Sequence, residues 1–217
     1  NLIRTGMLDI AVTGGADSPF SRGVVQAWCN LHALSTRNDD PARACRPFSA
    51  DRDGMVLGEG AGVLVLESEA SAARRGVTPL AVVEGYGASS DSFHLTRPSA
   101  EGPARALEKA LRDARLTPDN IGYINAHATG TIQNDSNETA ALRAVFGERA
   151  AHIPVVGNKA ALGHSIGASG ALELDGTDDQ VSTGAFSTAI GPSYTLTLWI
   201  YPRGYIDIVS SNASQWI

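Results

Sequence analysis

The stretch "INAHATGTIQNDSNETAAL", residues 124–142, runs from a short apolar segment through a loop of small and hydroxyl-bearing residues into a segment of helical character. A strand, a loop and a helix in this order form the repeating unit of α/β folds, which place their functional groups in loops at the carboxyl ends of strands. His127 lies at the start of this loop. It is therefore a candidate functional residue, and the alternative is a structural histidine bonded to the loop backbone.

The same alternation of apolar runs and amphipathic stretches continues along the chain and predicts an α/β fold. The clearest helix is expected over residues 102–115, where apolar residues recur every three or four positions. The run "VLVLE", residues 63–67, shows little alternation, so we expect a strand that is covered on both faces.

A second helix is expected to start near Asp135. Asp135 and Glu138 have the three-residue spacing of a capping box and precede a run of apolar residues. Gly147 follows that run and is expected to end the helix.

A second candidate site lies in "PVVGNKAALGHSIGASGALE", residues 154–173, where Lys159 and His164 are close in sequence. The small-residue segment after His164 is expected to be helical, which places the imidazole at a helix N-terminus. The helix dipole there favours a neutral ring that donates a hydrogen bond, as the stabilisation of an oxyanion requires. The alternative is a glycine-rich helix packed against a sheet, with Lys159 simply solvated.

The sequence "DRDG", residues 51–54, contains acidic residues that also occur in calcium-binding loops. Ser49 replaces the leading carboxylate of such a loop and Gly60 replaces its closing glutamate, so an EF-hand is not expected. Cys29 and Cys45 lie in different sequence contexts and form neither a metal-ligand pair nor a disulfide framework. We expect no metal and no bound cofactor.

The composition is that of an ordinary globular protein, with 43% hydrophobic and 18% charged residues. A formal charge of −6 and the lack of a Lys/Arg cluster argue against a nucleic-acid partner, because such binding is largely electrostatic. The sequence contains no apolar run long enough to span a membrane, and its first residues do not resemble a signal peptide. We expect a cytoplasmic protein with no membrane partner.

The composition changes near residue 176. Residues 176–217 are rich in aromatic residues, and Arg203 is their single basic residue. The segment "YTLTLWIY", residues 194–201, has strand propensity. We therefore expect residues 1–175 to form one unit and residues 176–217 to be an atypical tail.

Three stretches together resemble the β-ketoacyl synthases (ketosynthases) of fatty-acid and polyketide biosynthesis, in the order and at the separations found in that family. They are "RPFSADRDGMVLGEGAGVLVLE", "INAHATGT" with Glu138 following, and "GNKAALGHSIGASG". "ALSTRNDDPARACRPF" resembles the elongating branch that depends on acyl carrier protein. The resemblance covers residues 1 to about 173. It implies a thiolase-like fold with α/β/α/β/α layers, here incomplete, in a homodimer or heterodimer.

The resemblance also implies roles for four residues. His127 and His164 match the two catalytic histidines, which hold the malonyl thioester carbonyl and stabilise the enolate formed as carbon dioxide leaves. Lys159 matches the lysine that positions this pair, and Glu138 matches the glutamate that supports it from the following helix. Preorganised neutral donors in a dry pocket stabilise the developing negative charge better than water does.

The chain departs from the family's pattern at several positions. The family's nucleophilic cysteine is expected upstream of Asn1, and neither Cys29 nor Cys45 has its sequence context. The glycine- and phenylalanine-containing gating loop of the family has no match in the tail. Ala128 and Asn158 replace a glycine and a hydroxyl residue that are common in the family.

The expected parent function is a decarboxylative Claisen condensation of an acyl thioester with a malonyl group, both linked through phosphopantetheine to acyl carrier protein. The chain carries the decarboxylation half of that site, so we expect that it does not complete condensation alone. One alternative is a non-elongating partner of the chain-length-factor type. The other is an inactive fragment whose tail covers apolar surface and which self-associates.

Overall fold

The computed structural model describes residues 1–94, 97–168, 185–186 and 194–201. Its elements alternate between strands and helices over most of the chain, which confirms the α/β prediction. The elements are β1 Ile10–Asp17, α1 Arg22–Asn30, η1 Pro41–Arg43, β2 Gly60–Glu67, α2 Glu69–Arg75, β3 Val82–Ser90, α3 Glu101–Ala114, η2 Pro118–Asn120, β4 Ile124–Asn125, α4 Ile132–Phe146, η3 Gly147–Ala151, β5 Val155–Val156, α5 Lys159–Leu162, β6 Ala185–Phe186 and β7 Tyr194–Tyr201.

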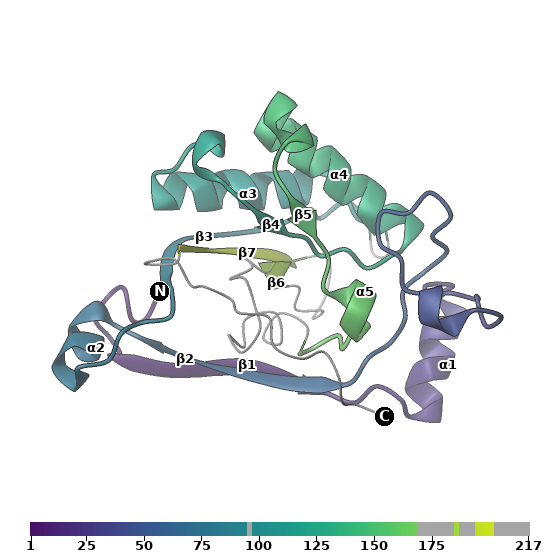
Figure 1. Ribbon diagram of the computed structural model, residues 1–217, viewed down its shortest axis with the longest axis horizontal. Helices are drawn as coiled ribbons and strands as arrows, with labels where there is room; N and C mark the ends of the chain where they lie inside the picture. Colours follow the sequence, from purple (N-terminus) through teal and green to yellow (C-terminus); the bar gives the residue numbers. More distant parts are fainter. Residues whose placement is uncertain (95–96, 169–184, 187–193, 202–217) are drawn as a thin grey trace, which may run out of the picture.

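Helices α3 and α4 lie on one side of β3 and β7, and the β1–β2 ribbon lies on the opposite side (Figure 1). The expected helix at 102–115 is confirmed as α3. It packs closely on β3 because glycines face it: a Cβ at Gly85 or Gly87 would collide with the backbone carbonyl oxygens of Ala110 and Ala106. Small residues on both elements therefore set this close approach.

The hydrophobic core of this layer joins α3 and α4 to β4. Its buried members are Leu107, Ala110, Leu111, Ile121, Ile124, Leu142, Phe146 and Ile153. Because α3 and α4 share this core, the N-terminal turn of α4 has a defined position beside the end of β4. That turn follows the loop that carries His127.

Helix α4 starts earlier than the sequence indicates. Thr131, not Asp135, is its N-cap, and the Thr131 hydroxyl accepts a hydrogen bond from the Asn134 backbone N–H. The predicted capping box is therefore wrong, because the carboxylates of Asp135 and Glu138 are both used by tertiary contacts instead. Gly147 ends the helix as expected.

Strands β4 and β5 form a parallel pair, with Ile124 opposite Val155 and Asn125 opposite Val156. The Ala126 N–H extends this ladder by donating to the Val156 carbonyl oxygen at 2.7 Å. The carboxyl ends of the two strands therefore lie at the same edge of the strand pair. This edge is where α/β folds place functional groups.

Strands β1 and β2 pair antiparallel, with Val12 opposite Val65. Val63 and Val65 are 66% and 63% exposed, so the expectation that "VLVLE" is covered on both faces is wrong. Side chains alternate between the two faces of a strand, and the described residues place no layer on the face that carries these valines.

The segment 194–201 forms β7, which confirms the predicted strand. β7 pairs antiparallel with β3 and with β6. The division of the chain at residue 175 stays a prediction. Within the described ranges, no helix has the length and apolar character needed to cross a membrane.

The exposed face of the β1–β2 ribbon is expected to drive self-association. Its apolar members are Ile10, Val12, Val63 and Val65. Replacing Val63 and Val65 with threonine keeps the β-branched shape and removes apolar area, so the doubly substituted chain should associate less. Sedimentation velocity over a range of concentrations measures this. Val77→Thr, at an exposed position outside the ribbon, is the control, and a parent chain that stays monomeric throughout would contradict the prediction.

Candidate active site

His127 lies two residues beyond β4, at the start of the loop that leads to α4. The next residue, Ala128, is fully buried and has a φ of 45°. This left-handed conformation costs about 1 kcal/mol for a residue with a Cβ, and it persists only where the surroundings hold it. Ala128 also lies against Gly157, where an added Cβ would collide with the Ala128 methyl group.

The Glu138 side chain holds the loop that carries His127 by accepting hydrogen bonds from the loop backbone. One carboxylate oxygen accepts from the His127 N–H at 2.6 Å, and the other accepts from the Ala128 N–H at 2.9 Å. Burial raises the pKa of Glu138, and these two backbone hydrogen bonds oppose that rise. The carboxylate therefore fixes the backbone that carries the histidine.

Lys159 is the first residue of α5 and is 3% exposed. The alternative of a solvated lysine is therefore wrong. The Cys45 thiol donates to the Lys159 carbonyl oxygen at 2.8 Å, which ties the segment after η1 to this turn. Since β5 ends three residues before Lys159, the β4–β5 pairing places the lysine at the same sheet edge as His127.

His164 is held by the segment that leads into β2. Its backbone N–H donates to the Val56 carbonyl oxygen at 2.7 Å, and its carbonyl oxygen accepts from the Gly58 N–H at 3.1 Å. Its ring Nδ1 accepts from the Ile166 N–H at 3.2 Å. A neutral ring that accepts at Nδ1 carries its proton on Nε2, which is then the hydrogen-bond donor.

The rings of His127 and His164 meet edge to face, with centroids 5.4 Å apart and an angle of 86° between their planes. Burial, followed by the charge of Lys159, lowers the pKa of His164 to about 3. The same two causes hold the pKa of His127 well below its ordinary value. Both rings are therefore neutral at neutral pH.

Burial is the main cause of the lowered His164 pKa. Most of the segment expected to form the following helix lies outside the described residues. The lowered pKa agrees with the neutral ring expected from the sequence, and the role of that ring as a donor stays a prediction.

The four residues singled out in the sequence thus meet at one place. The charge of Lys159 acts on both histidine rings and on Glu138. Two neutral rings beside a buried cation form an environment that stabilises negative charge on a ligand oxygen. Among the residues that the structure describes, no group of three or more His, Cys, Asp or Glu side chains is arranged to hold a metal ion.

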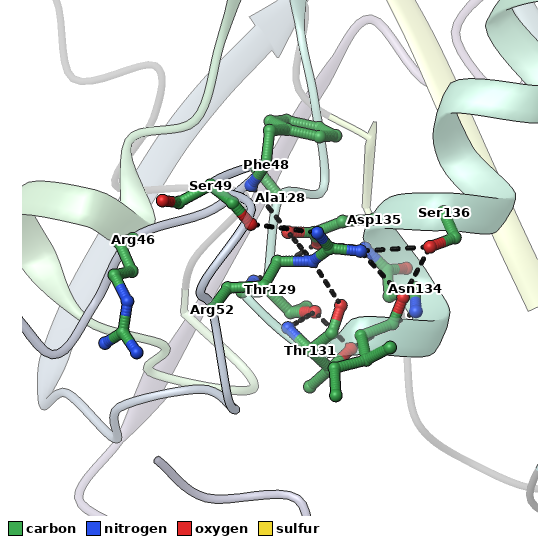
Figure 2. A network of polar contacts seen from close by, with 12 residues as sticks. Arg46, Phe48, Ser49, Arg52, Ala128, Thr129, Thr131, Asn134, Asp135 and Ser136 are labelled. Carbon is green, nitrogen blue, oxygen red and sulfur yellow. Dashed lines mark hydrogen bonds and ion pairs between the residues drawn. The ribbon is translucent and has the colours of Figure 1, made fainter. Parts of the chain in front are cut away.

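Sequence reasoning missed the ion pair between Arg52 and Asp135, which lies beside the His127 loop (Figure 2). Arg52 belongs to the "DRDG" sequence, and Asp135 lies one helical turn before Glu138. The sequence offered one signal for Asp135. It lies three residues before Glu138, and residues at this spacing share a helix face.

The two cysteines differ in their surroundings. Cys29 is exposed near the end of α1. Cys45 is half-buried, and burial raises the pKa of its thiol. A raised pKa disfavours the thiolate that nucleophilic catalysis needs.

Two family models match the chain. "Beta-ketoacyl synthase, N-terminal domain" matches residues 1–72, and "Beta-ketoacyl synthase, C-terminal domain" matches residues 80–187. The chain belongs to the β-ketoacyl synthase family.

Curated relatives agree with this assignment. Nodulation protein E of Rhizobium leguminosarum bv. trifolii is 48% identical over 172 residues, which are 79% of this chain and 41% of the relative. The 3-oxoacyl-[acyl-carrier-protein] synthase 2 of Staphylococcus aureus is 42% identical over 174 residues, which are 79% of this chain and 43% of the relative. The chain thus spans less than half the length of these relatives.

Solved structures of ketosynthases share the fold, which is thiolase-like and here incomplete. One is a type II polyketide acyl-carrier protein in complex with its ketosynthase bound to the hexaketide, with a TM-score of 0.81 and 30% identity over 94% of this chain and 58% of that chain. Another is the ishigamide ketosynthase/chain length factor, with a TM-score of 0.77 and 33% identity over 94% of this chain and 56% of that chain.

Lowering the pH from 7.5 to 5.5 is expected to destabilise the chain through the two buried histidines. Their ordinary pKa is 6.5, whereas the fold holds that of His164 at about 3 and that of His127 well below the ordinary value. Below pH 6.5 the unfolded state therefore binds more protons. Stability present above pH 6.5 is lost as the pH falls, by about 1 kcal/mol per histidine at pH 5.5. Urea unfolding at the two pH values measures the loss.

His164→Asn should remove about half of this pH dependence, because it removes one titrating ring while keeping an acceptor for the Ile166 N–H. His152→Asn, at an exposed position, is the matched control. Equal pH dependence in both variants would contradict the assignment of the loss to His164.

Proposed function

We propose that the site promotes decarboxylation of a malonyl thioester, as the first half of a Claisen condensation in fatty-acid or polyketide biosynthesis. The observation that carries this proposal is the pair of neutral histidine rings, 5.4 Å apart, next to the buried Lys159. The roles of His127, His164, Lys159 and Glu138 are part of the proposal.

The chemistry requires stabilisation of an oxyanion. The bond between the carboxylate carbon and the α-carbon breaks, carbon dioxide leaves, and the electron pair delocalises onto the thioester oxygen as an enolate. Neutral ring N–H groups can donate to this oxygen in a site from which water is largely excluded. In a complete condensation, the enolate carbon then attacks an acyl thioester and the thiol of that thioester leaves.

A carrier protein with a phosphopantetheine arm is the proposed partner. A groove of about 350 Å³ beside the N-terminus of α4 is lined by Phe93, Arg97, Pro98, Ile132, Gln133, Ser136 and Asn137. Phe93 and Ile132 are 65% and 63% exposed, and Arg97 supplies a positive charge. A long, mostly uncharged arm that carries a phosphate suits a groove of this composition.

A second candidate function is that of a non-elongating partner in a heterodimer. The similarity to a solved ketosynthase/chain length factor favours it, as does the unfavourable setting of the Cys45 thiol. The neutral histidine pair favours the decarboxylase, because a partner without chemistry has no evident need of it. An inactive fragment remains the third hypothesis, and the same measurements separate the three.

The purified chain is expected to release carbon dioxide from malonyl carrier protein and to form no condensation product with an acyl primer. His127→Ala and His164→Ala should each slow the release by roughly a hundredfold, because each removes one donor to the oxyanion. Carbon dioxide capture and mass spectrometry of the carrier protein provide the measurement. His152→Ala is the control, and a release rate that no substitution changes would contradict the proposed site.

Incubation with an excess of acyl carrier thioester is expected to leave the intact mass of the chain unchanged. The Cys45 thiol donates a hydrogen bond to the Lys159 carbonyl oxygen, and Cys29 lies in a sequence context unlike that of the family's nucleophile. A mass gain of one acyl group that is lost with hydroxylamine and maps to either cysteine would show that this chain carries its own nucleophile.

A further inference from the structure

Two carboxylates on one face of α4 hold the loop between His127 and Thr131. Glu138 accepts from the backbone at the start of this loop, at His127 and Ala128. Asp135 accepts from the Gly130 N–H at 3.2 Å, near its end. Asp135 is 1% exposed, so its charge needs compensation within the protein.

Arg52 supplies that compensation. Its Nε lies 3.3 Å from Asp135 Oδ2, and its side chain is 15% exposed. The guanidinium also donates to the carbonyl oxygens of Thr131 at 3.3 Å and Ile132 at 3.0 Å, and to the Ser136 hydroxyl at 2.9 Å. The two side chains therefore bind the loop and the first turn of α4 as one unit (Figure 2).

The position of Arg52 depends on its pairing with Asp135. The N-terminus of a helix carries partial positive charge, so a guanidinium beside the first turn of α4 is repelled unless an acid lies with it. Removing either partner would also leave a buried charge without compensation. The two side chains are therefore required together at this position.

The Arg52–Asp135 pair also contacts a second segment that contains a left-handed residue. Asp135 Oδ2 also accepts from the Phe48 N–H at 2.7 Å, and Phe48 has a φ of 61°. In the loop that Glu138 and Asp135 hold, Ala128 has a φ of 45°. Left-handed residues with a Cβ occur where surrounding contacts over-determine the backbone, and such places cluster at functional sites.

We propose that Arg52 and Asp135 are positioning residues for the His127 ring. They act through the backbone of residues 128–131 and do not touch the reacting atoms. The catalytic consequence rests on the proposed function, whereas the effect on the ring position does not. His164 provides the comparison, because hydrogen bonds with Val56, Gly58 and Ile166 hold it from other segments.

The test compares Arg52→Met, Arg52→Lys and Asp135→Asn with Arg74→Met in the full chain. Arg74 forms an exposed ion pair with Asp9 and serves as the matched control. Imidazole ¹⁵N resonances report the ring environments without any need for activity. We expect the His127 resonances to shift in Arg52→Met and Asp135→Asn, to shift less in Arg52→Lys, and to stay unchanged in Arg74→Met. The His164 resonances should shift less than those of His127 throughout.

The kinetic arm measures malonyl decarboxylation with the same variants. Arg52→Met should lower kcat by roughly tenfold to a hundredfold with a much smaller change in KM, because misplacement of a catalytic group acts on the chemical step. Arg52→Lys, which keeps the charge, should recover part of the rate. The variants are compared at temperatures well below their measured unfolding transitions.

Unchanged His127 resonances in folded Arg52→Met, Arg52→Lys and Asp135→Asn would overturn the positioning role, even if the free energy of unfolding falls. Shifted His127 resonances together with no decarboxylation by the parent chain would support positioning and overturn the proposed function. If Arg52→Met does not fold, the comparison rests on Arg52→Lys and Asp135→Asn, which preserve charge and shape respectively.

Discussion

The parallel pairing of β4 with β5 is the interaction on which the site depends. Each strand is only two residues long, and the Ala126 N–H adds one more rung to the ladder. Because the strands run in the same direction, the segments that follow them open at one edge and bring His127 and Lys159 together. The α3–α4 core supports this short pair, since Ile124 packs among its residues.

Burial then sets the electrostatics of the site. It holds His127 and His164 neutral and raises the pKa of Glu138, while Lys159 adds its charge to all three. Preorganised donors in such surroundings need little rearrangement when charge develops on a ligand. The strain at Ala128 is a cost of the same arrangement, because the loop must turn sharply between the sheet edge and α4.

The described layers differ in how well they are covered. Helices α3 and α4 cover one side of β3, whereas Val63 and Val65 of β2 are exposed. The curated relatives are more than twice as long as the segment they share with this chain. The exposed ribbon face is therefore the surface on which the predicted self-association depends.

The sequence by itself determined the α/β class, helix α3, strand β7, the end of α4 at Gly147 and the family, because these depend on local periodicity, turn residues and ordered motifs. It also singled out His127, Glu138, Lys159 and His164. Only the tertiary structure decided that Lys159 is buried, that Glu138 holds backbone N–H groups, and that Asp135 pairs with Arg52 and does not cap α4. Burial and long-range pairing depend on which segments meet in space, and spacing along the chain does not specify that.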